Sequence, residues 1–228
     1  MNPVPCSYSM HPTFHTQQPN HPDKEINMND KPVSTELKTI REVIPNTFIF
    51  EKTNALPGEL CDEMIRRFEA SEEDQYPGRI GQTVSSNQSI KKTTDLVVSG
   101  KPDWKDIDRA LFQSLGKAVL EFREKYIYFK GPFKDMGYNL QRYTAGEYYH
   151  WHIDGGSHDF SQRQLVALWY LNDVEGPGGE TEFLFQDTKI KPERGKLVLF
   201  PPFWTHEHRA VKLEKGVKYI ATTWVVFA

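Results

Sequence analysis

The sequence is poor in cysteine, with only Cys6 and Cys61 among its 228 residues. Two cysteines cannot build a disulfide framework or a multi-cysteine metal site, so a reducing, cytoplasmic location is the expectation. No apolar run approaches the roughly 18 residues that a transmembrane helix needs. The first residues also lack a basic stretch followed by an apolar one, which argues against a secretory signal. We therefore expect no membrane association.

An excess of charge of either sign is missing as well. The 28 Lys and Arg residues nearly balance the 31 Asp and Glu residues, for a formal net charge of −3. That balance offers a polyanion no general attraction, so nucleic acid is not an expected partner. Aromatic residues make up 13% of the chain, and its length suits one full-sized domain. The composition therefore indicates a well-packed globular protein.

The polar residues gather at the front. Residues 1–36 hold six of the 15 prolines and little apolar periodicity. Such a segment cannot bury enough surface to offset its ordering entropy, so we expect a disordered tail followed by a folded domain over residues 37–228. The tail histidines, His11, His15 and His21, are expected to be solvated. Met28 is an alternative natural start.

Helical patterns dominate the region from about 55 to 130. Leu60, Met64 and Phe68 are spaced four apart, as on one face of a helix. The strongest helix pattern covers residues 103–126. Its apolar stripe consists of Trp104, Ile107, Leu111, Leu115, Ala118, Phe122 and Tyr126. Between the two helices, the polar, glycine-rich residues 74–89 predict a mobile loop.

Strand patterns follow from about residue 137 to the end. Short β-branched or aromatic runs, separated by Gly, Pro, Asn or Asp, cover residues 138–143, 148–154, 164–173, 181–185, 196–210 and 218–227. No long helix separates them, which favours an antiparallel sandwich or barrel. The expected fold is mainly β with N-terminal helices, and its β-barrel core covers about 137–228.

Five of the eight histidines lie between residues 150 and 208. On a strand, His152 and Asp154 face the same side and present an imidazole and a carboxylate to one point. His206 or His208, from a later strand, can supply a third ligand. Two histidines and one carboxylate on one face of an octahedron form the facial triad of non-haem Fe(II) oxygenases. The competing interpretation is a hydrogen-bonded His–Asp pair at a strand end.

Lys218 stands at the head of an otherwise apolar strand. A cation in a half-buried strand is costly unless it pairs with an anion. A dicarboxylate co-substrate, bound to the metal at one end, would provide that anion at the other. The alternative is an edge lysine whose ammonium extends to solvent.

In this order, His152-x-Asp154, Gly178-Gly179-Glu180-Thr181, "GKLVLF", His208, Gly216 and Lys218 resemble the prolyl 4-hydroxylase branch of the 2-oxoglutarate- and Fe(II)-dependent dioxygenases. The resemblance runs from about residue 137 to the end. It implies a double-stranded β-helix (jelly roll) buttressed by helices, with Fe(II), 2-oxoglutarate and O₂, and activity supported by ascorbate. The implied reaction hydroxylates a C–H bond, of a prolyl residue in a peptide or protein, and releases succinate and CO₂. Another amino-acid residue or a small molecule is the alternative substrate.

The resemblance carries residue roles with it. His152 and Asp154 match the first two iron ligands. His208 matches the third, because the family spaces this histidine nine or ten residues before the basic residue that binds 2-oxoglutarate, here Lys218. Three aromatic residues match the co-substrate pocket, with plain core packing as the alternative: Tyr143, Tyr170 and Trp224.

The substrate side is expected around residues 76–96, where the family has a substrate-gripping segment. Its Arg79, Lys91 and Lys92 are candidate substrate contacts, or simply a solvated basic stretch. His150 and His206 are candidates for contacts behind the ligands or near substrate, and a regular strand would place His150 on the face of His152. Related nucleic-acid demethylases carry arginine at the positions of Lys218 and Trp224, which again argues against nucleic acid. A barrel that binds metal without turnover is the non-enzymatic alternative.

Overall fold

The computed structural model describes residues 39–81 and 86–228. The expected disordered tail, with its three histidines and Met28, lies outside these residues. No helix in the two described ranges combines the length and the apolar character needed to cross a bilayer.

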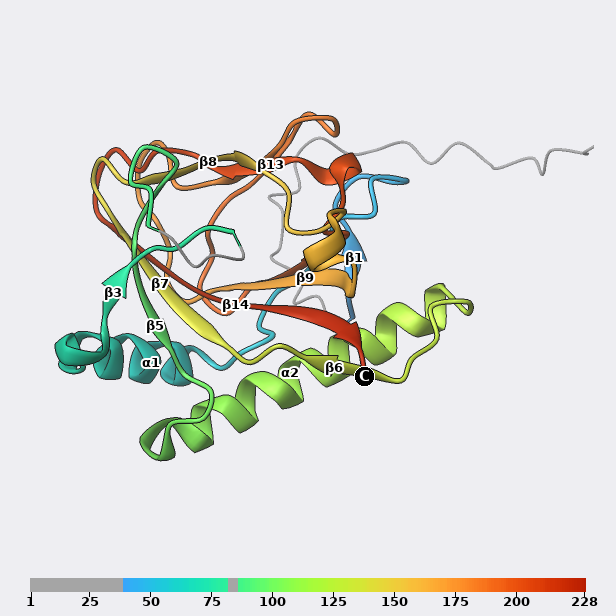
Figure 1. Ribbon diagram of the computed structural model, residues 1–228, viewed down its shortest axis with the longest axis horizontal. Helices are drawn as coiled ribbons and strands as arrows, with labels where there is room; N and C mark the ends of the chain where they lie inside the picture. The colour runs from blue at the N-terminus through green and yellow to red at the C-terminus, as the bar shows by residue number, and fades with distance from the viewer. Residues whose placement is uncertain (1–38, 82–85) are drawn as a thin grey trace, which may run out of the picture. The chain divides into compact units, whose positions relative to one another are not determined.

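The described chain consists of two α-helices and a set of mostly short strands (Figure 1). The helices are α1 (Gly58–Ala70) and α2 (Lys105–Lys125). The strands are β1 (Arg41–Glu42), β2 (Phe50–Lys52), β3 (Tyr76–Pro77), β4 (Lys91–Lys92), β5 (Thr94–Val97), β6 (Phe133–Asp135), β7 (Asn139–Thr144), β8 (Tyr148–His152), β9 (Arg163–Tyr170), β10 (Thr181–Phe183), β11 (Thr188–Ile190), β12 (Leu197–Phe200), β13 (His208–Ala210) and β14 (Val217–Phe227).

The strands form two antiparallel sheets. The larger sheet has the order β1-β2-β12-β9-β14-β7-β5-β3, with β6 also paired to β14. The smaller sheet has the order β11-β10-β13-β8-β4. In Figure 1 the β8 and β13 ribbons lie above β9 and β14, and the helices lie below. The predicted mainly-β class is confirmed, and the two sheets are consistent with a double-stranded β-helix.

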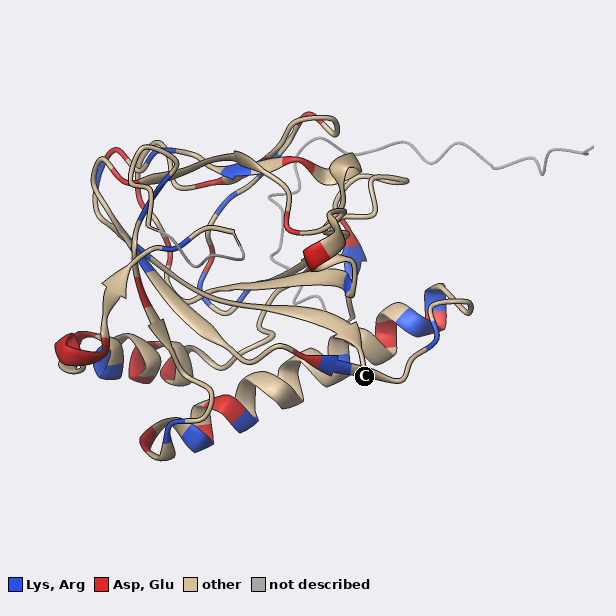
Figure 2. Ribbon diagram, viewed as in Figure 1, with Lys and Arg blue, Asp and Glu red and all other residues tan. Residues whose placement is uncertain are grey.

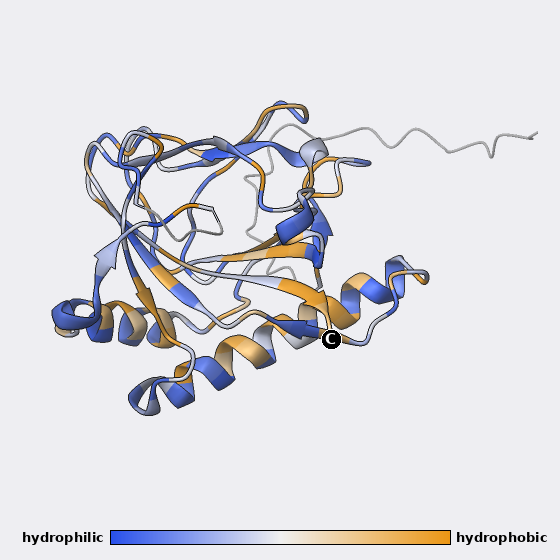
Figure 3. Ribbon diagram, in the orientation of Figure 1, coloured by the Kyte–Doolittle hydropathy of each residue, from blue (hydrophilic) through white to orange (hydrophobic). Residues whose placement is uncertain are grey.

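The central strand β9 is buried on both faces. Alternate residues belong to two different hydrophobic cores, because successive side chains of a strand point to opposite faces. Leu165, Ala167 and Trp169 pack in the core that includes both helices, whereas Val166, Leu168 and Tyr170 pack in the core between the sheets. Burial on both faces explains why this strand is a continuous apolar run rather than an alternating one (Figure 3).

The helices cover the larger sheet with their apolar stripes. The buried residues of α2 are Ile107, Leu111, Ser114, Leu115, Ala118 and Phe122, which confirms the predicted stripe. In α1, Cys61, Met64 and Phe68 are buried. Figure 2 shows charged residues along both helices, whereas β9 and β14 carry few. The side chains of the helices thus separate into a core face and a solvent face.

The predicted division into helices first and strands afterwards is wrong. β4 pairs with β8, and β5 with β7, so strands from the predicted helical region complete both sheets. β3 also falls within the predicted mobile loop and pairs with β5. These strands are only two to four residues long, and runs so short show no detectable alternation.

One buried polar contact joins α2 to the larger sheet. The Ser114 hydroxyl donates to the Ala55 carbonyl at 2.8 Å and accepts from the Trp169 indole N–H at 3.0 Å. We expect Ser114→Ala to lower the free energy of unfolding by about 1–3 kcal/mol, because it leaves the buried indole N–H unpaired. Chemical denaturation measures this change. Gln113→Ala, on the exposed face of the same helix, is the matched control, and an equal effect of the two substitutions would contradict the expectation.

Candidate active site

The pairing of β8 with β13 sets the geometry of the site. His208 lies opposite His152, and Ala210 lies opposite Tyr149. His150 and Trp151 of β8 therefore lie opposite the single residue Arg209 of β13. This arrangement is a β-bulge. The bulge lets Tyr149 and His152, three positions apart, both face the interior. Their rings stack with centroids 3.6 Å apart and planes 15° apart.

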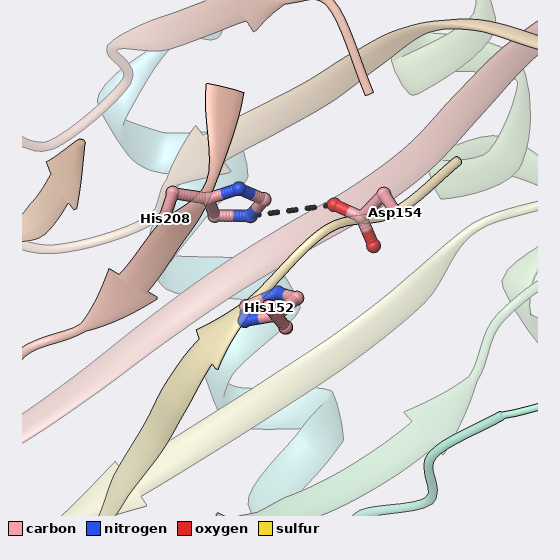
Figure 4. Close-up of side chains that lie close together, drawn as sticks. All are labelled: His152, Asp154 and His208. Carbon is pink, nitrogen blue, oxygen red and sulfur yellow. Dashed lines mark ion pairs between the residues drawn. The ribbon is translucent and has the colours of Figure 1, made fainter. Parts of the chain in front are cut away.

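Three potential metal ligands converge at the end of β8. Ligand atoms of His152, Asp154 and His208 all lie within 4.8 Å of one another. His208 Nε2 is 3.3 Å from Asp154 Oδ2, and Figure 4 shows both side chains beside His152. Ligand atoms about 2.1 Å from one octahedral ion lie about 3.0 Å apart, so this spacing suits a shared ion. The donor set of two imidazoles and one carboxylate fits Fe(II).

Backbone carbonyls orient both imidazoles. His152 Nδ1 lies 2.7 Å from the His150 carbonyl oxygen, and His208 Nδ1 lies 2.9 Å from the His206 carbonyl oxygen. A carbonyl accepts only, so each Nδ1 carries the proton and each Nε2 keeps its lone pair. This is how metal-binding histidines are ordinarily held. Both rings are therefore set for coordination through Nε2.

Burial and neighbouring groups hold the site in its metal-ready protonation state. Burial, together with the neighbouring His208, lowers the pKa of His152 to about 3. Burial by itself raises the pKa of Asp154, but the neighbouring His208 and the nearby Arg163 guanidinium outweigh burial and hold that pKa below its usual value. At neutral pH the site thus presents a neutral imidazole and a carboxylate.

Backbone contacts also hold the segment that carries Asp154. The N–H groups of Asp154 and Gly155 both donate to the Pro202 carbonyl, at 3.0 and 2.7 Å. Arg163 donates from Nη1 to the Asp154 carbonyl at 2.7 Å. A Cβ at position 155 would lie 3.1 Å from the Pro202 ring. Glycine therefore allows the backbone at position 155 to approach Pro202 closely. Arg163 carries no signal in the sequence, because its partners are not neighbours in the chain.

The three potential metal ligands line a cavity of about 100 Å³ between the sheets. Lys218 also lines the cavity, and only 1% of this residue is exposed. Its ammonium donates to the Gly179 carbonyl at 2.9 Å and lies 4.0 Å from the centroid of the Tyr143 ring. Within the described ranges it makes no salt bridge with a carboxylate. The predicted unpaired cation is therefore present, and it is buried rather than extended to solvent.

Burial lowers the pKa of Lys218 to about 7, although the more distant Glu180 carboxylate acts in the opposite direction. The ammonium form is costly in this cavity, and a bound anion would relieve that cost. A buried lysine that lines the same small cavity as three potential metal ligands suits a ligand with one metal-binding group and one anionic group.

The Gly-Gly-Glu-Thr turn builds the wall beside Lys218. Gly178 has φ = +87°, and a Cβ there would lie 2.1 Å from the Lys212 carbonyl oxygen. Thr181 lines the cavity, and its hydroxyl bonds to the Tyr170 hydroxyl at 2.6 Å. Tyr170 itself is not among the cavity-lining residues. The predicted contact of Tyr170 with the co-substrate therefore stays a prediction, now with Thr181 between them.

The other two predicted pocket aromatics line the cavity. The Tyr143 hydroxyl donates to Gln141 Oε1 at 3.1 Å, and Tyr143 pairs in register with Lys218 across β7 and β14. Trp224 lies on β14 and packs beneath the guanidinium of Arg163. Their contact with a co-substrate stays a prediction.

His206 and His150 do not lie beside the three ligands. His206 is buried, and its Nε2 and Nδ1 bond the Thr47 carbonyl and the Thr205 hydroxyl, both at 2.8 Å. The expectation that His150 shares the face of His152 is wrong, because the bulge turns its exposed side chain away from the cavity toward Tyr148. Both residues still serve the site through their backbone carbonyls.

The three basic residues predicted to contact substrate, Arg79, Lys91 and Lys92, have different surroundings. Arg79 is exposed, yet it lines the cavity and stacks on Tyr76. Lys91 lines the cavity too, but it is buried and forms a 2.7 Å ion pair with Asp95. Lys92 alternates with Lys91 on β4, is exposed, and does not line the cavity. Of these three residues, Arg79 is the one that lines the cavity without an ion pair to a described carboxylate.

Comparisons with known proteins agree with this architecture. A sequence profile described as the 2OG-Fe(II) oxygenase superfamily matches residues 138–226. A search of curated proteins finds no match. The resemblance indicated by the sequence motifs is confirmed by the profile match and by the solved structures that follow.

Several solved prolyl hydroxylases share the fold. The viral collagen prolyl hydroxylase of Paramecium bursaria Chlorella virus-1, in complex with 2-oxoglutarate, has a TM-score of 0.61 at 20% identity, over 82% of this chain and 99% of that chain. The Trichoplax adhaerens prolyl hydroxylase, in complex with a hypoxia-inducible-factor peptide, has a TM-score of 0.67 at 19% identity, over 79% and 84%. A Pseudomonas putida prolyl-4-hydroxylase has a TM-score of 0.60 at 18% identity, over 79% and 93%.

The two neighbouring histidines are expected to respond differently to substitution. His208→Ala should abolish measurable Mn(II) or Fe(II) binding, because one of three ligands is lost. His206→Ala should leave metal affinity within a few-fold of the parent but lower the free energy of unfolding by about 1–3 kcal/mol, because it removes a buried ring and the partly buried Thr47 carbonyl loses its partner. Metal titration and denaturation of both variants measure these effects. Metal loss in His206→Ala with retention in His208→Ala would reverse the assignment.

Proposed function

We propose that the protein is a 2-oxoglutarate- and Fe(II)-dependent dioxygenase that hydroxylates a prolyl residue in a peptide or protein. The observation that carries the proposal is the joining of His152, Asp154 and His208 to the buried, uncompensated Lys218 by one cavity. A metal site by itself does not require a buried lysine, and a buried lysine by itself does not require a metal site. Together they match a small molecule with one metal-binding end and one anionic end.

Fe(II) is the metal that the three ligands would hold, and 2-oxoglutarate is the dicarboxylate that would reach Lys218. Once bound, the iron supplies O₂ activation coupled to oxidation of 2-oxoglutarate to succinate and CO₂, and the second oxygen atom enters the substrate C–H bond. The atoms balance as 2-oxoglutarate, O₂ and R–H giving succinate, CO₂ and R–OH. Ascorbate is proposed to keep the iron reduced.

The chain's own residues hold and shield the reactants. Lys218 orients the far carboxylate, while Tyr143 and Trp224 flank it. Thr181 is placed to assist, with its hydroxyl held by Tyr170. The apolar part of the cavity wall excludes water and strengthens the charge interaction with Lys218; it consists of Val166, Leu168, Phe200 and Ile220.

The substrate assignment has its own support. All three structural neighbours described above are prolyl hydroxylases, and one of them is a complex with a peptide. Arg79 is the proposed substrate contact, because its exposed guanidinium borders the cavity. Cys61, a buried free thiol, suits the reducing cytoplasm that we propose as the location.

Oxidation of a peptide library tests the function. The purified protein is incubated with Fe(II), ascorbate, 2-oxoglutarate and proteome-derived peptides, and mass spectrometry locates residues that gain one oxygen atom. We expect gains at proline, matched by succinate, and none with the Asp154→Ala variant. Gains only at another residue type would overturn the prolyl assignment, and the absence of both products would overturn the enzymatic one.

Lys218 is expected to set 2-oxoglutarate affinity without affecting the metal. Lys218→Met removes a charge-assisted contact in a dry cavity and leaves the bound carboxylate unpaired, a loss of about 1.5–5 kcal/mol. Calorimetric titration of the Mn(II) protein should therefore show about ten- to several-thousand-fold weaker 2-oxoglutarate binding. Lys215→Met, an exposed lysine nearby, is the control. Unchanged affinity in Lys218→Met would remove the co-substrate assignment.

The same lysine makes binding and stability depend on pH. Since the folded-state pKa is about 7 and an unfolded lysine titrates near 10.4, the unfolded chain binds the extra proton between these values. Stability contributed by this group therefore rises with pH across that window. A bound anion restores the proton, so 2-oxoglutarate affinity should fall as pH rises above about 7. Both dependences should be absent in Lys218→Met when denaturation and calorimetry are repeated at several pH values.

A further inference from the structure

We propose that Arg163 is a positioning residue that holds the carboxylate ligand Asp154 and the cavity-lining Trp224 in one fixed arrangement. The inference rests on the proposed function, because it assigns a task at the same metal site and cavity. Arg163 is the first residue of β9, and its side chain reaches back over the turn that follows Asp154.

The first contact is with the ligand's own peptide group. Arg163 Nη1 donates to the Asp154 carbonyl at 2.7 Å, while the Asp154 N–H donates to the Pro202 carbonyl at 3.0 Å. The ligand is thus held through its N–H on one side and its C=O on the other. The segment between Asp154 and Arg163 is a loop with only one short helical turn, and Asp154 lies beyond the end of β8. The hydrogen bond from Arg163 therefore restrains the Asp154 backbone where strand pairing has ended.

The second contact is a stack of three flat groups. The guanidinium carbon of Arg163 lies 3.7 Å from the Trp224 ring centroid and 4.1 Å from the Phe160 ring centroid. A guanidinium plane stacks well on an indole, whereas an ammonium does not present a plane. Trp224 lines the cavity, so the position of its ring depends on the stack.

The third observation concerns the charge of Arg163. No carboxylate side chain within the described ranges forms a salt bridge with it, and its Nε is buried without a hydrogen-bond partner. A merely stabilising surface arginine would keep its head in water or on a carboxylate. Here the guanidinium contacts one carbonyl and two rings, and of these the carbonyl belongs to Asp154 and the Trp224 ring lines the cavity.

Two substitutions separate the two contacts. Arg163→Ala removes both, and we expect Mn(II) affinity, measured by electron paramagnetic resonance titration, to fall about ten- to hundredfold, the usual cost of losing a residue that orients a metal ligand. Arg163→Lys keeps a donor for the carbonyl but loses the stack. It should regain most of the Mn(II) affinity, while 2-oxoglutarate affinity, measured by calorimetry, stays reduced in both variants.

Arg142→Ala is the matched control. Arg142 is also a partly exposed strand arginine near an aromatic ring, Phe68, but it lies on the opposite face of β7 from the cavity-lining Tyr143. We expect Arg142→Ala to leave both affinities unchanged.

If the parent binds Mn(II) and 2-oxoglutarate and Arg163→Ala matches Arg142→Ala, the inference is overturned and the proposed function stands. If Arg163→Lys binds Mn(II) as poorly as Arg163→Ala, the carbonyl contact is not the cause and the inference is likewise overturned. A parent that binds neither ligand would overturn the proposed function itself.

Discussion

The register that sets His152 opposite His208 is the constraint on which the candidate site depends. With one bulge in β8, both imidazoles face the interior, and each finds the carbonyl two residues earlier for its Nδ1–H. A slip of one residue would turn a whole strand over, because the side-chain period is two. Asp154 lies two residues beyond the end of β8. Its backbone contacts with Pro202 and Arg163 hold its carboxylate close to the imidazoles of His152 and His208.

The second constraint is the burial of Lys218 on β14. This strand lies between β9 and β7 in the larger sheet, which has the helices against one face and the smaller sheet across the other. A cation at such a place is unfavourable unless something anionic arrives. The burial that stabilises the sheet therefore also favours an anionic ligand beside Lys218. Arg163 contacts both the cavity-lining Trp224 and the Asp154 carbonyl.

Much of the fold was predictable because its signals are local. The apolar stripe of α2 and the long apolar run of β9 reflect burial on one face and on two faces, and periodicity reports both directly. The short strands β3, β4 and β5 were missed, because two to four residues show no period and the partners of β4 and β5 lie far along the chain. Lys91 illustrates the same limit, since only the structure shows that Asp95 neutralises it while Lys92 faces outward.

The sequence by itself determined which residue types were available for chemistry: His152 and Asp154 at strand spacing, a histidine pair at 206 and 208, and a lysine on an apolar strand. Only the tertiary structure decided between the two histidines by contact, turned His150 outward, and joined Lys218 to the metal ligands through one cavity. The physical reason is that side-chain alternation is a property of the local backbone, whereas a bulge, a cross-strand register and a stack such as that of Arg163 are set by partners distant in the chain.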